Sequence, residues 1–318
     1  MRHRVLILGA GKMGREHLAA FAACDDAEVV AVVSRGGDSA GKLAGANGVK
    51  VHGSDLEAAC VSSGATAVVV AASHTESENL VRKCLNFGLH VLAEKPVALD
   101  STAARHLSAQ ADTAGLVACA AVNRRFYPGL LDGFLRLSTL GPLRHLSLVV
   151  SDSPEERRAM GRQPGDVCDR WFIMNTIHAI DLIRMMGGEV VSMTGSLRRP
   201  RIDRESIAAH ILTDRGLQVA LSLTGGPNLP WSLRLSGESG TLLAEPLEVA
   251  HLRLGKEDAS YVLGHPEPSG LKMGLMGQAR AFLGAIESRK KPFPISDFND
   301  HARTIELCEQ LLALPEAP

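Results

Sequence analysis

The sequence predicts an α/β protein in which a doubly wound parallel sheet is followed by a second α/β domain built on a large, mostly antiparallel sheet. Up to residue 122, apolar strand candidates alternate with helices of ten or more residues, a pattern typical of parallel sheets. Residues 188–262 instead hold short apolar strands separated by Gly, Pro and charged turns, which is typical of antiparallel sheets. Because 318 residues allow about two domains, we expect domains at 1–122 and 123–318, the last helix being free to pack back on the first domain.

The first strand candidate, residues 5–8, is apolar throughout and runs directly into a glycine pattern. Gly9, Gly11 and Gly14 have the spacing G-x-G-x-x-G, with Lys12 and Met13 between the last two. The first glycine permits a tight turn, the second lets a pyrophosphate approach the backbone, and the third lets the next helix close on the strand. Free amides at that helix N-terminus would face the anion. This context predicts a dinucleotide-binding Rossmann domain.

The end of the second strand, residues 27–33, indicates the type of dinucleotide. An acid at this position binds the ribose 2′-hydroxyl of NAD, whereas a small polar residue with an arginine accommodates the 2′-phosphate of NADP. The residues here are Ser34 and Arg35, and Asp38 lies four residues beyond Ser34. The sequence therefore favours NADP(H) over NAD(H); in the other interpretation Arg35 is a solvated loop cation and NAD(H) binds.

Further strands are expected at 67–72, 90–93 and 116–122, and helices at 15–24, 55–61, 76–87 and 102–114. Ligands of such sheets bind at the carboxyl ends of the strands. The loops that carry Ser73-His74, Glu94-Lys95-Pro96 and Asn123-Arg124 should therefore share one crevice with the glycine turn.

Three segments resemble the Gfo/Idh/MocA oxidoreductases, the family of glucose–fructose oxidoreductase and inositol dehydrogenase. They are the glycine pattern, HVLAEKP at 90–96 and NRRFYP at 123–128, and SGESGTL at 236–242 is similar to the family's late sheet signature. The resemblance implies hydride transfer between a nicotinamide cofactor and a sugar, cyclitol or related small polyol or ketone. It also implies a homodimer or homotetramer that pairs through the open face of the C-terminal sheet.

Lys95 is the candidate for stabilising charge on the substrate. An ammonium at the crevice can hydrogen-bond a sugar hydroxyl and favour its developing alkoxide. Glu94 beside it could hold the ammonium in place or tune its pKa, and the resemblance implies that the Lys95–Pro96 bond is cis, as it often is in the family. A surface lysine before a loop proline is the alternative interpretation.

His178 is the candidate general base. Ile173, Ile177 and Ile180 fall on one helical stripe and Met174, His178 and Asp181 on another, so the residues alone leave a structural and a catalytic histidine both open. The resemblance implies a D-x-x-x-H-x-x-D motif here, in which His178 takes the hydroxyl proton. The sequence departs from that motif, since Met174 stands at its first acid; Asn175, one place later, is the candidate substitute.

Other residues receive weaker assignments. The family resemblance places substrate contacts near Asn123, Arg124 and Tyr127, and Trp171 is the better of the two tryptophans for stacking on a sugar. His74 could touch cofactor or substrate, or be a solvated loop histidine. Residues 151–169 are expected to form a loop that serves as a substrate lid or an oligomer contact.

Charge and cysteine usage exclude some function classes. A net charge of −1 with no single-sign block argues against nucleic-acid or membrane-surface partners. No apolar run approaches the roughly 20 residues of a membrane span, so we expect a cytoplasmic protein. The six cysteines form no C-x-x-C pair, and we expect no metal.

Two further functions remain open from the sequence. The missing acid at Met174 would suit a non-catalytic NAD(P)-binding regulator. A reductase of an imine or a tetrapyrrole would keep the cofactor but would not need Lys95.

Overall fold

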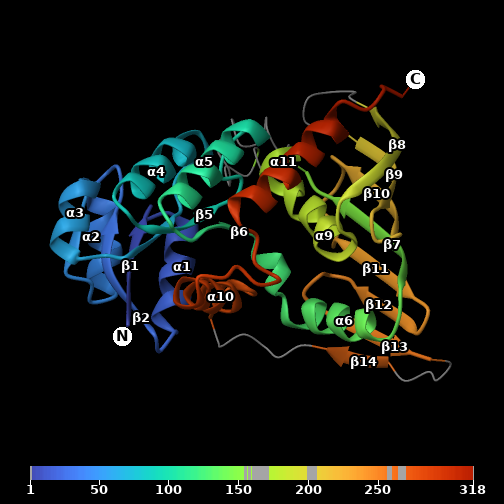
Figure 1. Cartoon of the computed structure of the whole chain (residues 1–318), viewed down its shortest axis with the longest axis horizontal. Helices are drawn as coiled ribbons and strands as arrows, with labels where there is room; N and C mark the ends of the chain where they lie inside the picture. The colour runs from blue at the N-terminus through green and yellow to red at the C-terminus, as the bar shows by residue number, and fades with distance from the viewer. Residues whose placement is uncertain are drawn as a thin grey trace. The chain divides into compact units, whose positions relative to one another are not determined.

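The computed structural model describes residues 2–153, 156, 159, 172–198, 206–255, 260–263 and 270–317. They form two compact units, each with one β-sheet (Figure 1). The first unit comprises residues 1–126 and 267–303, and the second comprises residues 127–266 and 304–318. The first boundary thus follows Phe126 instead of Val122, and a segment far along the chain returns to the first unit.

The first unit holds a six-stranded parallel sheet with the order β3-β2-β1-β4-β5-β6. All four residues of β4 and the last four of β1 are buried, as expected for apolar strands covered on both faces. This strand order is that of the dinucleotide-binding sheet, and its reversal between β1 and β4 leaves a crevice at the carboxyl ends. The predicted Rossmann domain is therefore confirmed. Its strands are β1 (His3–Leu8), β2 (Ala27–Val33), β3 (Val51–Gly53), β4 (Ala67–Val70), β5 (His90–Glu94) and β6 (Ala118–Ala121).

Helices cover this sheet, and one of them was not predicted. Helix α2 falls in a stretch with five glycines between residues 36 and 48, which weaken any helical pattern, and the short strand β3 that follows it was not predicted either. Burial of Ala40, Leu43 and Ala44 stabilises α2 in spite of this. The helices are α1 (Lys12–Ala22), α2 (Asp38–Ala46), α3 (Leu56–Ser63), α4 (His74–Asn86), α5 (Ser101–Thr113) and the 3₁₀ turn η1 (Asn123–Phe126).

Helix α10 (Leu275–Ser288) also packs in the first unit, against α1. The rings of Phe21 and Phe282 meet edge to face with centroids 6.3 Å apart, and both side chains are fully buried. The sequence-based boundary placed this helix in the second domain. Its apolar face was visible in the sequence, but periodicity does not show which surface covers an apolar face.

The second unit is built on an eight-stranded sheet with the order β14-β13-β12-β11-β7-β10-β9-β8. Among the described pairings only β7 with β10 is parallel, which confirms the mostly antiparallel prediction. The edge strand β14 was not predicted. The strands are β7 (Leu143–Ser151), β8 (Val190–Arg198), β9 (Ser206–Thr213), β10 (Gln218–Thr224), β11 (Ser232–Gly237), β12 (Gly240–Ala244), β13 (Ala250–Leu254) and β14 (Ser260–Leu263).

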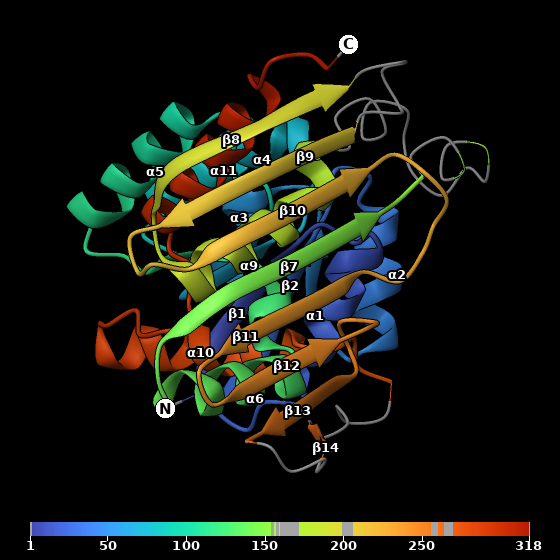
Figure 2. The same ribbon diagram turned by 90° about the vertical axis from the view of Figure 1, so that its right-hand side faces the viewer.

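Helices α6 (Pro128–Thr139) and α9 (Ile177–Gly187) contact one face of this sheet. The other face is turned to the viewer in Figure 2, where these helices lie behind the strands. The side chains of Val149, Leu212 and Leu243 on β7, β9 and β12 remain 42%, 39% and 40% exposed. The last helix, α11 (Phe298–Leu312), begins in the first unit and ends in the second.

Candidate active site

The loop between β1 and α1 has the geometry that the three glycines predict. Gly9 has a φ of +116°, and a Cβ there would overlap the carbonyl oxygen of Ala71. A Cβ on Gly14 would overlap the carbonyl oxygen of Gly9, whereas one on Gly11 would meet no protein atom within 4 Å. The fold therefore requires Gly9 and Gly14, while Gly11 keeps space open for a ligand.

The amino end of α1 suits an anion. Its cap residue is Gly11, so no side chain at the cap accepts a hydrogen bond from the helix amides. The first turn also holds no acidic residue. The first amides of the helix therefore have no side-chain acceptor from the cap, which is how helix N-termini receive phosphates. Lys12 is exposed and Met13 is half-buried at this position.

Residues after β2 form a small polar cluster at the start of α2. The Oγ atoms of Ser34 and Ser39 are 2.7 Å apart, and Ser34 is buried whereas Arg35 is exposed. Asp38 is the first residue of α2. Two hydroxyls, a guanidinium and a helix N-terminus are thus gathered in one short segment, together with one exposed carboxylate.

Ser73 and His74 follow β4, which pairs directly with β1. Ser73 is the cap residue of α4, with its Oγ 3.2 Å from Oγ1 of Thr75, and His74 is buried. Both residues therefore start from the same sheet edge as the glycine turn. Their contact with cofactor or substrate remains a prediction.

Lys95 follows β5 directly and is half-buried. Its pKa is lowered from the ordinary value to about 8, chiefly by burial; the charge of Glu94 opposes this lowering, and the charges of Arg124 and Lys272 contribute to it. Lys95 is thus mostly an ammonium at neutral pH, yet its pKa lies close to the range in which proton transfer is efficient. The Lys95–Pro96 peptide bond is cis, as the family resemblance implied.

Glu94 is paired with a histidine that sequence reasoning missed. Nε2 of the fully buried His17 lies 2.9 Å from Oε1 of Glu94 and donates to it. Burial alone would raise the pKa of Glu94, but the hydrogen bond from His17 and the charges of Lys95 and Lys272 lower it. Glu94 is therefore ionised beside Lys95. The sequence did hold one indication of this pair: His17 is a polar residue on the apolar face of α1, three residues after Gly14.

Lys272 is a second residue that the sequence did not reveal. Its Nζ lies 3.5 Å from Sδ of Met13 in the glycine turn. Asn123 anchors this segment, because its side-chain amide donates to the carbonyl oxygen of Met273 at 2.8 Å. No local pattern marks Lys272, since Met13 is 259 residues away in the chain.

The residues expected to contact substrate are distributed over both units. Buried Asn123 uses its amide on Met273, and Arg124 is close enough to Lys95 to affect its pKa. Tyr127 belongs to the second unit, where its hydroxyl donates to Glu248 at 3.4 Å. Trp171 and most of the expected 151–169 loop lie outside the described residues. Their contacts with substrate remain predictions.

His178 lies in the first turn of α9 and is 6% exposed. Directly before it, residues Phe172–Thr176 form a π-helical segment that contains Met174 and Asn175. The side-chain amide of Asn175 donates to the carboxylate of Asp152, which follows β7 and is 2% exposed. The structure thus places an acid next to Asn175 that the sequence analysis did not consider.

A buried polar network joins α9 to the part of α11 that belongs to the second unit, which begins at Thr304. Nη1 of Arg184 donates to Oγ1 of Thr304 at 2.9 Å, and this hydroxyl lies 3.4 Å from Oδ1 of Asp181. Arg184 also pairs with Glu189 at 2.6 Å. The helix that carries His178 is therefore held by satisfied polar groups as well as by packing.

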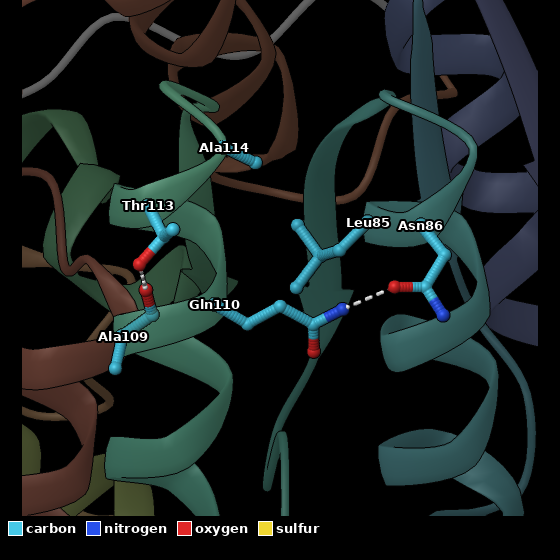
Figure 3. Close-up of a pocket in the computed structure, with 6 residues that line it drawn as sticks. All are labelled: Leu85, Asn86, Ala109, Gln110, Thr113 and Ala114. Carbon is cyan, nitrogen blue, oxygen red and sulfur yellow. Dashed lines mark hydrogen bonds between the residues drawn. The ribbon is translucent and has the colours of Figure 1, made fainter.

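A groove between the last turns of α4 and α5 is a different feature of the first unit (Figure 3). Gln110 spans it, donating to Oδ1 of Asn86 at 2.8 Å. Helices of parallel βα units end at the amino edge of the sheet, opposite the glycine turn and Lys95. The groove therefore does not belong to the candidate cofactor site.

The described residues offer neither a metal site nor a membrane-spanning helix. Among them, no three His, Cys, Asp or Glu side chains form a group that could hold a metal ion. The helices formed by these residues also include none with the length and apolar character needed to cross a membrane.

Comparison with known proteins confirms the resemblance seen in the sequence. Residues 3–122 match the model of the GFO_IDH_MocA family, described as an oxidoreductase family with an NAD-binding Rossmann fold. The chain is 24% identical to 4-carboxy-2-hydroxymuconate-6-semialdehyde dehydrogenase of Sphingobium sp., over 91% of this chain and 92% of that one. It is 27% identical to inositol 2-dehydrogenase of Rhizobium meliloti, over 91% and 88%. The structure of UDP-N-acetylglucosamine 3-dehydrogenase from Acidithiobacillus ferrooxidans shares the fold, with a TM-score of 0.82, 20% identity and coverage of 99% and 98%.

Proposed function

We propose that the chain is an NAD(P)-dependent oxidoreductase of the Gfo/Idh/MocA family that transfers hydride between NADP(H) and a sugar, cyclitol or related small polyol or ketone. One observation carries the proposal. Lys95, whose pKa is lowered to about 8, follows a strand of the same sheet that presents the glycine turn. A cation with a tuned pKa at the ligand-binding edge of a dinucleotide fold suits the stabilisation of an alkoxide.

In this mechanism the cofactor supplies the chemistry of accepting or donating a hydride at its nicotinamide ring. The Lys95 ammonium donates a hydrogen bond to the substrate oxygen and stabilises the negative charge that develops there. His178 accepts the hydroxyl proton during oxidation and returns it during reduction. Glu94, held by His17, keeps a negative charge beside Lys95 and so preserves its ammonium form.

The preference for NADP(H) is supported by the residues after β2. Arg35 and the hydroxyls of Ser34 and Ser39 offer a cation and hydrogen-bond donors at the amino end of α2. The open space beside Gly11 fits the pyrophosphate, and Lys272 adds a cation beside Met13.

A second substrate class is favoured by the charges around Lys95. Arg124 and Lys272 both lower the pKa of Lys95, so three cations face the single carboxylate of Glu94. This excess suits a substrate that carries a carboxylate. The Sphingobium relative is named for a carboxylated semialdehyde. A test panel should therefore hold carboxylated aldehydes and hydroxy acids besides polyols.

We also propose that the chain forms a homodimer or homotetramer through the open face of the sheet in the second unit. The exposed apolar side chains of Val149, Leu212 and Leu243 support this pairing. Light scattering should give the mass of two or four chains, and Leu212→Lys with Leu243→Lys should shift it to one. An unchanged mass would exclude this face as the interface.

The direct experiment follows nicotinamide absorbance between pH 7 and pH 9 with each panel compound. Lys95→Ala should lower kcat by about a hundredfold or more. The control, Lys83→Ala, removes an exposed lysine from α4 and should leave kcat unchanged. Turnover that survives Lys95→Ala would favour a reductase of an imine or tetrapyrrole. NADP binding without any turnover, together with an NADP-dependent protein partner, would favour a regulator.

A further inference from the structure

Asp152 occupies a fixed position at the end of the central strand β7. Its backbone N–H donates to the carbonyl oxygen of Thr224 at 3.1 Å, at the end of the neighbouring strand β10. The next residue is also held, because the N–H of Ser153 donates to Oδ1 of Asn228 at 3.1 Å. The carboxylate is 2% exposed. A negative charge is therefore held rigidly in a place from which water is largely excluded.

The side chain that reaches this carboxylate is Asn175, one turn before His178. Asn175 donates its amide to Oδ2 of Asp152. His178 follows three residues later, in the first turn of α9. The π-helical turn at Phe172–Thr176 is the kind of irregularity that redirects side chains at functional sites. Asp152 is thus bonded to a residue that lies three positions before His178 in the same unit.

We propose that Asp152 is a positioning residue for His178, acting through Asn175, and that it supplies the negative charge absent from position 174. This inference rests on the proposed function, in which His178 takes a proton. Met174 can provide neither charge nor a strong acceptor. The chain instead places the acid after strand β7 and connects it to the histidine helix through an amide.

The charge matters most when His178 becomes an imidazolium. During oxidation a bound NAD(P)⁺ would take the hydride of the substrate's carbon–hydrogen bond, while the hydroxyl proton moves to His178 and a carbonyl is left. A buried imidazolium is unfavourable unless a negative group lies near it. The Asp152 carboxylate provides that group and limits the orientations open to Asn175.

Asp152→Asn tests the role of the charge, because the amide keeps the shape of the side chain. We expect kcat to fall ten- to a hundredfold, with KM nearly unchanged and a larger solvent deuterium isotope effect on kcat. Met174→Asp in the Asp152→Asn background should recover most of this loss, and alone it should bring no gain. Ser151→Ala removes the neighbouring hydroxyl at the end of β7, which donates to the carbonyl oxygen of Pro227, and should leave kcat unchanged. Equal changes in kcat and KM, or a failed rescue in a folded protein, would overturn the proposal.

A measurement without substrate separates this inference from the proposed function. In protein labelled with ¹⁵N at histidine, the ring signals of His178 are assigned by their loss in His178→Gln. Asp152→Asn and Asn175→Ala should each shift these signals and leave those of the other histidines unchanged. Unchanged His178 signals in either folded variant would contradict the positioning role. Shifted signals in a chain that turns over no substrate would keep the positioning role and contradict the proposed function instead.

Discussion

The two units specify their candidate site residues in different ways. In the first unit, the glycine turn and Lys95 each come directly after a buried strand, so local sequence and backbone geometry fix them. In the second unit, the helix that carries His178 and the turn before it are held by contacts with separate segments: Asn175 bonds Asp152 after β7, and Arg184 bonds Thr304 in α11. A site built on backbone constraints can be read from a motif, whereas one built on side-chain contacts can exchange its members.

The largest effect is expected from a substitution in the glycine turn, whose shape is fixed by backbone geometry. Gly9→Ala forces a Cβ against the carbonyl of Ala71 at a φ of +116°. We expect a loss of at least about 2 kcal/mol in the free energy of unfolding and no measurable cofactor binding. Gly11→Ala is the matched control, because its Cβ meets no protein atom. It should keep the stability and weaken NADP(H) binding about tenfold, measured by calorimetry. Equal stability of both variants would refute the different roles of the two glycines.

A second prediction sharpens the electrostatics of the first unit. The ammonium form of Lys95 is the active one, so activity should fall as pH rises through its pKa of about 8. Glu94 raises the pKa of Lys95, so Glu94→Gln should move this fall to lower pH; Lys272 lowers the pKa, so Lys272→Met should move it to higher pH. Profiles of kcat/KM against pH measure both shifts. Shifts in the same direction would contradict the assigned charges.

A third prediction concerns the network of the second unit. Thr304→Val removes the hydroxyl that lies between Arg184 and Asp181 in the buried interior. Losing this group should lower the free energy of unfolding by about 1–3 kcal/mol, measured in urea. Thr139→Val removes an exposed hydroxyl that bonds only within its own helix turn at Arg136, and it should change stability much less. A similar cost for both variants would show that the network does not stabilise α9.

The smallest expected effect concerns cofactor choice. Arg35→Ala should weaken NADP(H) binding about tenfold and leave NAD(H) binding unchanged, because only NADP carries the 2′-phosphate. Fluorescence titration with both cofactors measures the difference. If binding of NADP(H) and NAD(H) weakened equally, Arg35 would not distinguish the 2′-phosphate and would act only as a general cation for the cofactor's phosphates.

The sequence predicted much of the fold because its strands are strongly apolar. The six-stranded parallel sheet follows from alternating strands and helices, and the glycine turn from backbone geometry that few other residues can adopt. Helix α2 escaped prediction because its glycines hide the pattern and burial stabilises it. The placement of α10 escaped because the packing of Phe21 on Phe282 joins distant segments.

The same distinction applies to the site. Lys95 was predictable because it follows a strand, whereas His17 and Lys272 reach Glu94 and Met13 only in the folded chain. At position 174 the family resemblance implied an acid that the sequence lacks, and the sequence could not show that the Asp152 carboxylate lies beside Asn175. Asp152 is 23 residues from Asn175, and only the fold brings them together.

A double-variant cycle on kcat tests whether Lys95 and His178 serve one hydride transfer. Lys95→Ala, His178→Gln and the double variant are compared with the native chain on the best substrate, each after confirming cofactor binding. Groups that act on the same substrate oxygen in one step act as a unit, so the double variant should be about as slow as the slower single variant. If the two losses multiply in full, Lys95 and His178 act independently, and the proposed mechanism is wrong.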